Sequence, residues 1–426
     1  MKELDLLDDF ASDCESLYVY GAGMVGQRVI QYLKSSPYGS LIKGIIVSNR
    51  VNELNNISGI RVFQPNEVDF EDMRGIIVGM QTVPFQVKEN CFNLQSERIL
   101  CLNIQLQKAL RKWQLERLCC IAVDGGCHLK APSETDDPEA VICFSDDSKY
   151  FRVYNLECED HIKSIKEYCT MAEFEKEYGG RLKRLGEKDW KDSKDNHNLT
   201  EVFIATTHLD DANVFEDNNG VHYFLQVGAA LTKKRKGCKC DNVGINISRK
   251  NRSYCECTGI YWIWKNTSGQ DYVGLEHYRR RMVLGKADVE SLSCNNVDIV
   301  LPLPQFSVLK NMEHIHKSLV TSLDWELMKR FVTDFCPAYK DIIAKYENGY
   351  FYFSCNIGLL RREIFDDYCS FAFSVADKLE TYYAEHSIIR LEDRYMGFIF
   401  EHMFSIYIMK HYKDWNVYVT DLLWKT

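Results

Sequence analysis

The sequence has no surplus of positive charge and no long apolar run. Its 52 Lys and Arg residues are outnumbered by 61 Asp and Glu residues, for a formal net charge of −9. This balance argues against nonspecific nucleic-acid binding, which needs an excess of cations. A basic patch at residues 233–239 is an exception, and such runs are most often solvated loops. No apolar stretch approaches the roughly 20 residues that span a bilayer, and the acidic N-terminus is unlike a signal peptide.

The cysteines form no disulfide framework. There are 17, an odd number, scattered along a chain too large to need disulfides for stability. Without an export signal, this pattern indicates reduced thiols and a cytoplasmic protein. Two close pairs, Cys238 with Cys240 and Cys255 with Cys257, leave a zinc site as a minor alternative, although zinc sites usually have Cys-x-x-Cys spacing.

The first part of the chain predicts a Rossmann-like domain at residues 1–105. Short β-rich runs at 17–20, 42–47, 75–79 and 98–101 alternate with helical segments. This alternation predicts a parallel sheet with right-handed crossovers. The weaker patterns of residues 106–198 are interpreted as a partly helical connector, which ends in a polar run.

Residues 199–426 predict a second α/β domain. Strands are expected at 201–208, 271–275, 297–301 and 351–360, and helices at 254–265, 324–335, 361–379 and 392–410. The last helix carries apolar residues on most faces, which predicts that it is buried. The expected fold class is therefore α/β, with two such domains in one chain.

A glycine motif follows the first expected strand and opens a helix. Gly21, Gly23 and Gly26 have the spacing of a dinucleotide-binding loop, where a helix N-terminus attracts phosphate. The acidic residue that would bind the ribose of NAD is absent, since residues 48–50 are Ser-Asn-Arg. The segment resembles the small Rossmann domains of bacterial surface-polysaccharide enzymes. Three interpretations stay open: a ligand-free scaffold or regulatory domain, a nucleotide or nucleotide-sugar site, and an NAD(P)-dependent oxidoreductase.

Charged residues gather where one strand of the second domain ends. Residues 276–281 read Glu-His-Tyr-Arg-Arg-Arg. Ligands of open α/β sheets bind outside the carboxyl ends of the strands. Guanidinium groups bind diphosphate bidentately and stay charged, so they can stabilise a leaving diphosphate. The plainer interpretation is a surface turn with solvated arginines.

These residues carry a family resemblance. The sequence resembles a bacterial family of capsular and exopolysaccharide glycosyltransferases, long described only as a domain of unknown function (DUF4422-like). The resemblance is carried first by the segments QVGAAL, DNVGINISRKNRSYCECTGIYWIWKN and VGLEHYRR. VDIVLPLP, FSCNIGLLRREIFDDYC and RYMGFIFEHMF continue the resemblance, which covers about residues 201–408. One departure is Ile245, where the family pattern has Asp.

The resemblance implies a GT-A-like domain that transfers a sugar from a nucleotide diphosphate in surface-polysaccharide synthesis. A UDP-sugar is the expected donor, with galactofuranose as a candidate sugar. The expected acceptor is a saccharide, lipid-linked at the inner face of the cytoplasmic membrane. Residues expected to bind the donor are Thr207, His208, Gln226, Asp241, Asn246, Ser248, Asn251, Glu256, Lys265, Glu276, Tyr278 and Asn356.

The second domain lacks the Asp-x-Asp pair with which GT-A enzymes often hold a divalent metal. We therefore expect Arg279 and Arg280 to replace the metal at the diphosphate, with His277 beside them as a further catalytic candidate. In the alternative, Glu276 and His277 hold a metal with a distant ligand.

An inverting reaction also needs a general base for the acceptor hydroxyl. The candidates are Asp393 and Glu401, with Glu392 beside them. Glu401 interrupts an apolar helix, so its alternative role is that of a buried partner for Arg394 or for an arginine of 279–281. The aromatic residues at 261–264 either stack on a base or pack in the core. The rival functions are the oxidoreductase and a noncatalytic nucleotide-sensing scaffold.

Overall fold

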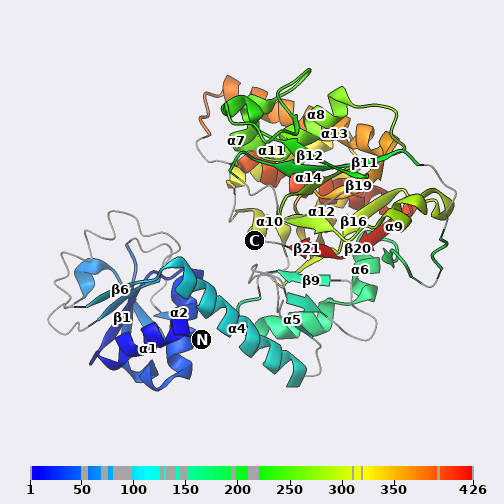
Figure 1. The fold of residues 1–426 in the computed structure, drawn as a ribbon. Coiled ribbons are helices and arrows are strands. Elements are labelled where there is room, and N and C mark those ends of the chain that lie inside the picture. The colour runs from blue at the N-terminus through cyan, green and yellow to red at the C-terminus, as the bar shows by residue number, and fades with distance from the viewer. Residues whose placement is uncertain are drawn as a thin grey trace. The chain divides into compact units, whose positions relative to one another are not determined.

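The computed structural model of the chain contains two compact units, Met1–Ile121 and Ala122–Thr426. Each unit combines helices with a largely parallel sheet, as the fold class predicted from the sequence requires (Figure 1). The structure describes residues 2–48, 56–68, 75–79, 98–124, 129–130, 141–143, 151–154, 156–187, 189–192, 198–209, 220–308, 311–317, 320–390 and 394–424.

The N-terminal unit is built on a six-stranded sheet with the order β3-β4-β2-β1-β5-β6. All neighbouring strands are parallel except β3 and β4, which pair antiparallel. The order reverses direction between β1 and β5, as in doubly wound sheets. The strands are β1 (Leu17–Tyr20), β2 (Ile42–Ile46), β3 (Asn56–Ile57), β4 (Ile60–Phe63), β5 (Ile76–Val78) and β6 (Ile99–Cys101).

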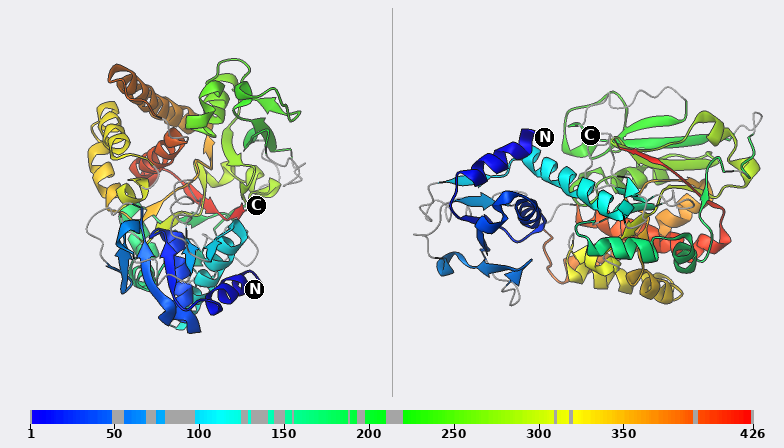
Figure 2. Two further views of the ribbon diagram at one scale, coloured as in Figure 1. Left: turned by 90° about the vertical axis from the view of Figure 1, so that its left-hand side faces the viewer. Right: turned by 90° about the horizontal axis from the view of Figure 1, so that it is seen from below.

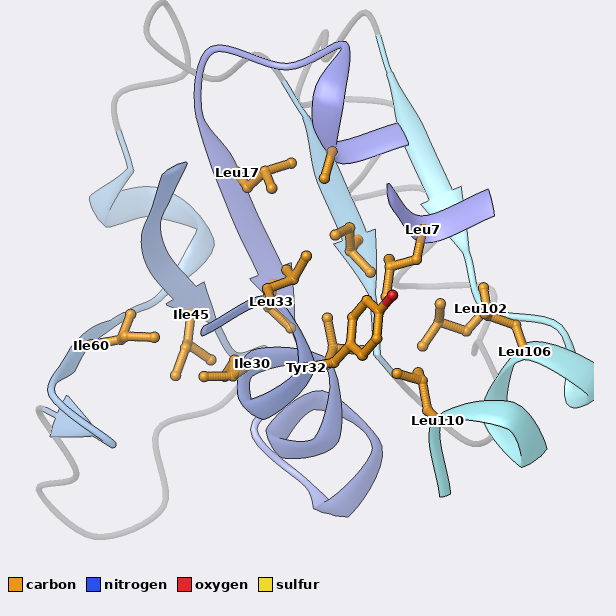
Figure 3. Close-up of a cluster of buried hydrophobic side chains, with 14 of the residues drawn as sticks. Leu7, Leu17, Ile30, Tyr32, Leu33, Ile45, Ile60, Leu102, Leu106 and Leu110 are labelled. Carbon is orange, nitrogen blue, oxygen red and sulfur yellow. The ribbon is translucent and has the colours of Figure 1, made fainter. Parts of the chain in front are cut away.

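Three helices cover one face of this sheet. They are α1 (Lys2–Ser12), α2 (Met24–Ser35) and α4 (Ile104–Asp124). Their apolar residues pack with Leu17 and Ile45 of the strands in one buried cluster (Figure 3). Tyr20 and Ile46 point to the opposite face, where they form a second buried cluster. Burial on both faces explains why these strands read as continuous apolar runs in the sequence.

Backbone geometry explains two of the three glycines in the predicted phosphate loop. Gly21 has a φ of 112°, a conformation that L side chains rarely adopt. A Cβ atom on Gly26 would lie 1.9 Å from the carbonyl oxygen of Gly21. Gly23 precedes α2, and a Cβ atom there would meet nothing within 4 Å. The folded unit itself therefore requires Gly21 and Gly26, whereas space is open at Gly23.

The C-terminal unit has a main sheet of ten strands, with the path β10-β20-β16-β19-β14-β11-β12-β13 and with β15 joining β14 to β21. Along this path only β19 runs against its neighbours. The strands are β10 (Lys183–Arg184), β11 (Thr200–Thr206), β12 (His222–Gln226), β13 (Lys239–Cys240), β14 (Tyr272–His277), β15 (Arg280–Met282), β16 (Ile299–Pro302), β19 (Gly358–Arg361), β20 (Val417–Thr420) and β21 (Leu422–Trp424).

The boundaries expected at residues 105 and 198 differ from the observed division at Ile121. The segment interpreted as a connector supplies strands to the C-terminal unit: β10 pairs with β20, and β9 pairs with β17. β9 and β17 belong to a five-stranded sheet of β18 (Phe351–Tyr352), β17 (Gln305–Ser307), β9 (Phe151–Tyr154), β8 (Val141–Cys143) and β7 (Leu129–Lys130). Short strands of two to four residues give weak sequence patterns, which explains the difference.

Three long helices and one of nine residues lie together on one side of the C-terminal unit (Figure 2). They are α11 (Ser322–Phe335), α12 (Tyr339–Glu347), α13 (Arg362–Glu385) and α14 (Tyr395–His411). As predicted, α14 is buried along most of its length. The shorter helices are α5 (Asp160–Tyr168), α6 (Met171–Tyr178), α7 (Asn251–Tyr254), α8 (Cys257–Asn266), α9 (Lys286–Glu290) and α10 (Met312–Lys317). No helix in the described ranges is both long and apolar enough to span a membrane.

The single strand expected at 351–360 is two strands in different sheets, β18 and β19. The chain breaks between them at Cys355 and Asn356, which have φ values of 70° and 51°. Left-handed residues cannot continue a strand. Because β19 is antiparallel to β14, this break lies at the carboxyl end of β14, beside His277.

Candidate functional site

A cleft of about 480 Å³ opens at the carboxyl ends of β11, β12 and β14. The chain leaving β14 stays close to β11, because the amide of Tyr278 donates to the carbonyl oxygen of Ala205 at 3.0 Å. We call this space the arginine cleft, after four of its lining residues. It is lined by Ala205, Thr207, Val227, Asn251, Arg252, Cys255, Glu256, His277, Tyr278, Arg279, Arg280 and Arg394.

The structure places two of the three consecutive arginines in this cleft. Arg279 is exposed and stacks on the ring of Tyr278, with 4.8 Å between its Cζ atom and the ring centroid. Arg280 donates to the Sγ atom of Cys355 at 3.3 Å. Arg281 is buried instead, and its Nε atom donates to Glu276 at 3.0 Å. Neighbouring strand residues point to opposite faces, which corrects the expectation of three arginines at one edge.

Arg252 and Arg394 line the same cleft, and the sequence did not reveal them as site residues. The amide of Arg394 donates to the carbonyl oxygen of Arg252 at 2.7 Å, so a backbone hydrogen bond fixes the two residues side by side. Arg394 was considered in the sequence only as a partner for Glu401. Arg252 lies inside the segment NRSYCE, which carries part of the family resemblance, and this position could have indicated a role in the site.

Glu256 is the single carboxylate among the residues that line the arginine cleft. Its Oε1 atom accepts a hydrogen bond from Asn356 Nδ2 at 2.8 Å and lies 3.8 Å from His277 Nε2. Burial lowers the pKa of His277 to about 4, despite the opposing charge of Glu256, so the ring is neutral at pH 7. Glu256 therefore lies between an amide donor and an uncharged imidazole.

Two buried polar atoms beside Glu256 form no hydrogen bond within the described part of the chain. They are the Nε2 atom of His277 and the Oδ1 atom of Asn356. Buried polar groups are nearly always hydrogen-bonded, so orphans at a cleft need an explanation. A bound substrate that supplies polar groups at this point would satisfy them.

Glu401 lies on α14 close to these residues, but it does not line the cleft. Burial raises the pKa of its carboxyl to about 7, and the negative charge of Glu256 adds to the effect. The positive charges of Arg280 and Arg394 act in the opposite direction. The buried-partner role considered for Glu401 thus involves both arginines.

Replacing Glu401 with glutamine should stabilise the protein more at high pH than at low pH. The carboxyl has its ordinary value of 4.5 when unfolded and about 7 when folded. The native state therefore binds an extra proton between these values, and stability present below pH 4.5 is lost as the pH rises through 7. Glutamine cannot ionise. The difference in unfolding free energy between Glu401→Gln and the wild type should grow from near zero at pH 4.5 to at most about 3 kcal/mol at pH 8.

Chemical denaturation at both pH values measures this difference. The exposed Glu385→Gln at the end of α13 serves as the matched control for loss of one negative charge. A Glu401→Gln effect of equal size at both pH values would contradict the raised pKa.

Strained backbone surrounds the cleft. Cys255, Cys355, Asn356 and Arg394 all have φ values between 51° and 71°, although none is glycine. Such conformations cost about 1–3 kcal/mol each and cluster at functional sites. They are half of the eight positive-φ non-glycine residues in the described ranges. Their gathering at one place is independent support for a functional site here.

Several residues expected to bind the donor are instead used inside the protein. Asp241 is fully buried and accepts hydrogen bonds from the amides of Gly228 and Ala229 and from the hydroxyls of Ser248 and Thr258, at 2.5–3.0 Å. Since these donors occupy its lone pairs, Asp241 holds the loop together and Ser248 assists it.

Gln226 and Asn246 are engaged in the same way. The side chain of Gln226 is buried and bonds the backbone of Lys234 and Lys236. Asn246 bonds the backbone of Gly244 and Ser248 within its own loop and lies outside the arginine cleft. The structure therefore corrects the donor-binding role expected for these side chains.

Glu276 does not fit either role predicted for it. Its carboxylate is fully buried and accepts from Arg281 Nε at 3.0 Å and from the amide of Met282 at 2.8 Å. It faces away from His277, so the two cannot hold one metal ion as a pair. Among the described residues no group of three or more His, Cys, Asp or Glu side chains could hold a metal. The cysteines considered for zinc, at 238, 240, 255 and 257, form no disulfide.

The remaining candidates lie elsewhere. Lys265 is exposed on α8 and stacks on Trp264, outside the cleft. Tyr261 and Trp264 pack against Phe373 of α13, so they belong to helix packing. His208 does not line the cleft. Asp393 and Glu392 lie outside the described residues. Thr207, Asn251, Glu256, His277, Tyr278, Arg279 and Arg280 do line the cleft, and Asn356 contacts Glu256 beneath it.

Comparison with known proteins gives one family match and two weak structural likenesses. The apo structure of WbbM, a bifunctional glycosyltransferase, is 26% identical with a TM-score of 0.47, and the match covers 54% of this chain and 46% of that one. RSP, a Rex-family repressor, is 17% identical with a TM-score of 0.20 over 29% of this chain and 66% of that one. Both TM-scores are below 0.5, so neither likeness assigns an activity.

The chain thus spans less than half the length of WbbM. No curated protein matches the chain. Residues 203–412, which include every residue lining the arginine cleft, match the family described as a domain of unknown function, DUF4422.

Proposed function

We propose that the C-terminal unit transfers a sugar from a nucleoside diphosphate donor to a saccharide acceptor. The observation that carries this proposal is the arginine cleft, where four guanidinium groups surround one carboxylate at the carboxyl ends of parallel strands. Cationic clamps of this kind stabilise a transferring or departing phosphate group. The volume of about 480 Å³ suits a ligand of nucleotide size. The sequence resemblance to bacterial polysaccharide glycosyltransferases supports the same activity.

Arg279 and Arg280 bind the diphosphate in this proposal, and Arg252 and Arg394 complete the positive field. Glycosyl transfer breaks the bond between the anomeric carbon and the diphosphate oxygen, which keeps the electron pair. Arginine stabilises that charge without a proton transfer and without a metal ion. Arg279 and Arg280, the arginine clamp, thereby take the role of the divalent metal that an Asp-x-Asp pair would hold.

Glu256 accepts the proton of the acceptor hydroxyl as the new bond to the anomeric carbon forms. It is the carboxylate that reaches the cleft, whereas Glu401 lies behind it. A carboxylate within hydrogen-bond reach of the hydroxyl is the usual base for such a step. The neutral ring of His277, 3.8 Å away, positions the substrate rather than carrying charge.

The proposed donor is a UDP-sugar, with galactofuranose as a candidate sugar, and the proposed acceptor is a saccharide or lipid-linked saccharide of a bacterial surface polysaccharide. The proposed place is the cytoplasm, at the inner face of the membrane. The cysteines identified as free thiols support a reducing compartment. We also propose that this catalytic unit is GT-A-like, as the family resemblance implies; along the path of its main sheet only β19 runs against its neighbours.

Nucleotide binding tests the proposal directly. Thermal unfolding is measured with UDP, GDP, CMP and NAD(H), each with EDTA and with Mn²⁺. One nucleoside diphosphate should raise the melting temperature in EDTA, because a ligand of the native state adds RT ln(1 + [L]/Kd) to stability. Arg279→Ala should abolish the rise, whereas the exposed Arg330→Ala on α11 should not.

The same assay separates the rival functions. A response to NAD(H) alone, lost in Gly23→Asp, would favour an oxidoreductase on the N-terminal unit. Binding of a nucleoside diphosphate with neither transfer nor hydrolysis of any sugar nucleotide would favour a nucleotide-sensing scaffold.

A further inference from the structure

A second concave surface of about 680 Å³ adjoins the arginine cleft. Its lining residues include Thr232, Lys233, Arg235, Asn242, Asn246 and Arg249. We call it the basic cleft. The short segments η4 (Ala229–Leu231) and η5 (Ser248–Lys250) contribute to it. Val227, two residues before η4, and Asn251, directly after η5, line the arginine cleft.

The basic cleft concentrates positive charge in an acidic protein. Residues 228–252 contain eight Lys and Arg residues and one acidic residue, Asp241, in a chain with a net charge of −9. Asp241 is buried and fully engaged in hydrogen bonds, so it does not offset the surface charge. Lys233, Lys234, Arg235 and Arg249 are exposed.

Few of these cations are neutralised within the described part of the chain. Lys250 pairs with Glu380 at 2.6 Å. Arg235 donates to the backbone carbonyls of Thr232 and Lys234 and meets no carboxylate among the described residues. Lys233 and Arg249 form no ion pair with any described residue. Their charge is therefore available to a partner.

Three exposed apolar side chains are sequence neighbours of residues that line this cleft. Leu231 is 49% exposed, Val243 64% and Ile245 60%. Leu231 immediately precedes Thr232, and the other two lie between the lining residues Asn242 and Asn246. Large apolar side chains beside a basic surface are typical of proteins that lie on membranes.

The loop that carries Val243 and Ile245 is held rigidly. The carbonyl oxygen of Val243 accepts from Trp262 Nε1 at 2.7 Å, and Ile245 exchanges two backbone hydrogen bonds with the side chain of Asn266, at 2.7 and 3.0 Å. These contacts fix the loop to α8 while its apolar side chains stay in solvent. The exposure is thus built into the structure.

We propose that the basic cleft and its apolar rim bind the surface of an anionic lipid bilayer. Lys233, Arg235 and Arg249 would contact lipid headgroups, and Leu231, Val243 and Ile245 would enter the interfacial layer. Charge attraction and shallow insertion together give stable, reversible binding where either alone is weak. Given the proposed transferase, this docking also brings the arginine cleft to the surface where a lipid-linked acceptor is found.

Vesicle co-sedimentation of the full chain tests the proposal. We expect binding to phosphatidylcholine vesicles that contain about a third phosphatidylglycerol, little binding to phosphatidylcholine alone, and release at high salt. Lys233→Ala with Arg235→Ala should weaken the partition coefficient about 30-fold. Val243→Asn with Ile245→Asn should weaken it about tenfold. The control Lys163→Ala with Arg330→Ala removes the same charge elsewhere in the unit and should change it less than threefold.

Two results would overturn the proposal. One is equal binding of wild type and of the Lys233/Arg235 variant to anionic vesicles. The other is displacement from vesicles by micromolar inorganic pyrophosphate, which would assign the basic cleft to a soluble phosphate ligand. Arg279→Ala separates this test from that of the transferase, since it should lose nucleotide binding and keep vesicle binding.

Discussion

Replacing Glu256 with glutamine is expected to lower the rate of sugar transfer by about 10²–10⁴-fold, the usual contribution of a general base. The affinity for the nucleoside diphosphate should change by less than about threefold, because the arginines bind that group. Glutamine keeps an oxygen that can accept the hydrogen bond from Asn356 Nδ2, now 2.8 Å long, so the fold should persist. Single-turnover transfer and nucleotide binding, measured on the same variant, separate the two effects.

The outcome for Glu256 also decides the role of Glu401. Glu401 is one of the base candidates that the sequence suggested, yet it does not line the cleft, and the charges of Arg280 and Arg394 act on its carboxyl. If Glu256→Gln kept most of its activity and Glu401→Gln lost it, the base would be Glu401 and the assignment made here would be wrong. Glu385→Gln, on the exposed end of α13, controls for the loss of a carboxylate.

Much of the fold could be predicted from local sequence patterns. The apolar runs at 42–47 and 271–275 correspond to β2 and β14, and the periodic segment 324–335 to α11, because each is long enough to display its period. The break between β18 and β19 was not predicted. Cys355 and Asn356 adopt left-handed conformations there. Neither residue type predicts such a conformation from the sequence as strongly as glycine does.

The site was predictable where its residues are neighbours in sequence. His277 ends β14 and Arg280 begins β15, with Tyr278 and Arg279 between them, so a single motif placed the four residues together. The sequence also allowed the prediction that Glu276 and His277 face opposite sides of the sheet, because successive side chains of a strand alternate between its faces. The structure has a cleft at the carboxyl ends of the parallel strands, where ligands of open α/β sheets bind.

Tertiary contacts decide the rest of the site. Polar residues such as Asp241 and Gln226 look alike in sequence whether they bind a ligand or the backbone. Only their folded partners show that their hydrogen bonds are already made. Arg252 and Arg394 are distant in the chain and meet through one backbone hydrogen bond. No spacing rule connects them.

Replacing Arg280 with alanine is expected to lower the rate of transfer by about 10²–10³-fold, the usual loss when one preorganised donor to a developing charge is removed. Arg279→Ala, which should abolish the nucleotide-induced thermal shift, should cost less in the transfer rate at saturating donor, because Arg279 is exposed, whereas Arg280 is held against Cys355 at 3.3 Å. EDTA should leave the wild-type rate unchanged.

Chemical rescue distinguishes a role in charge stabilisation from a structural one. Millimolar guanidinium ion should restore part of the activity of Arg280→Ala, since a free guanidinium can occupy the vacated space beside the diphosphate. Arg280→Lys should retain more activity than alanine but less than the wild type, because an ammonium group keeps the charge and loses the bidentate geometry. Arg330→Ala, an exposed arginine on α11, should behave as the wild type throughout. Full activity of Arg280→Ala would contradict the role proposed for Arg280. Loss of wild-type activity in EDTA would show that a metal ion stabilises the diphosphate instead.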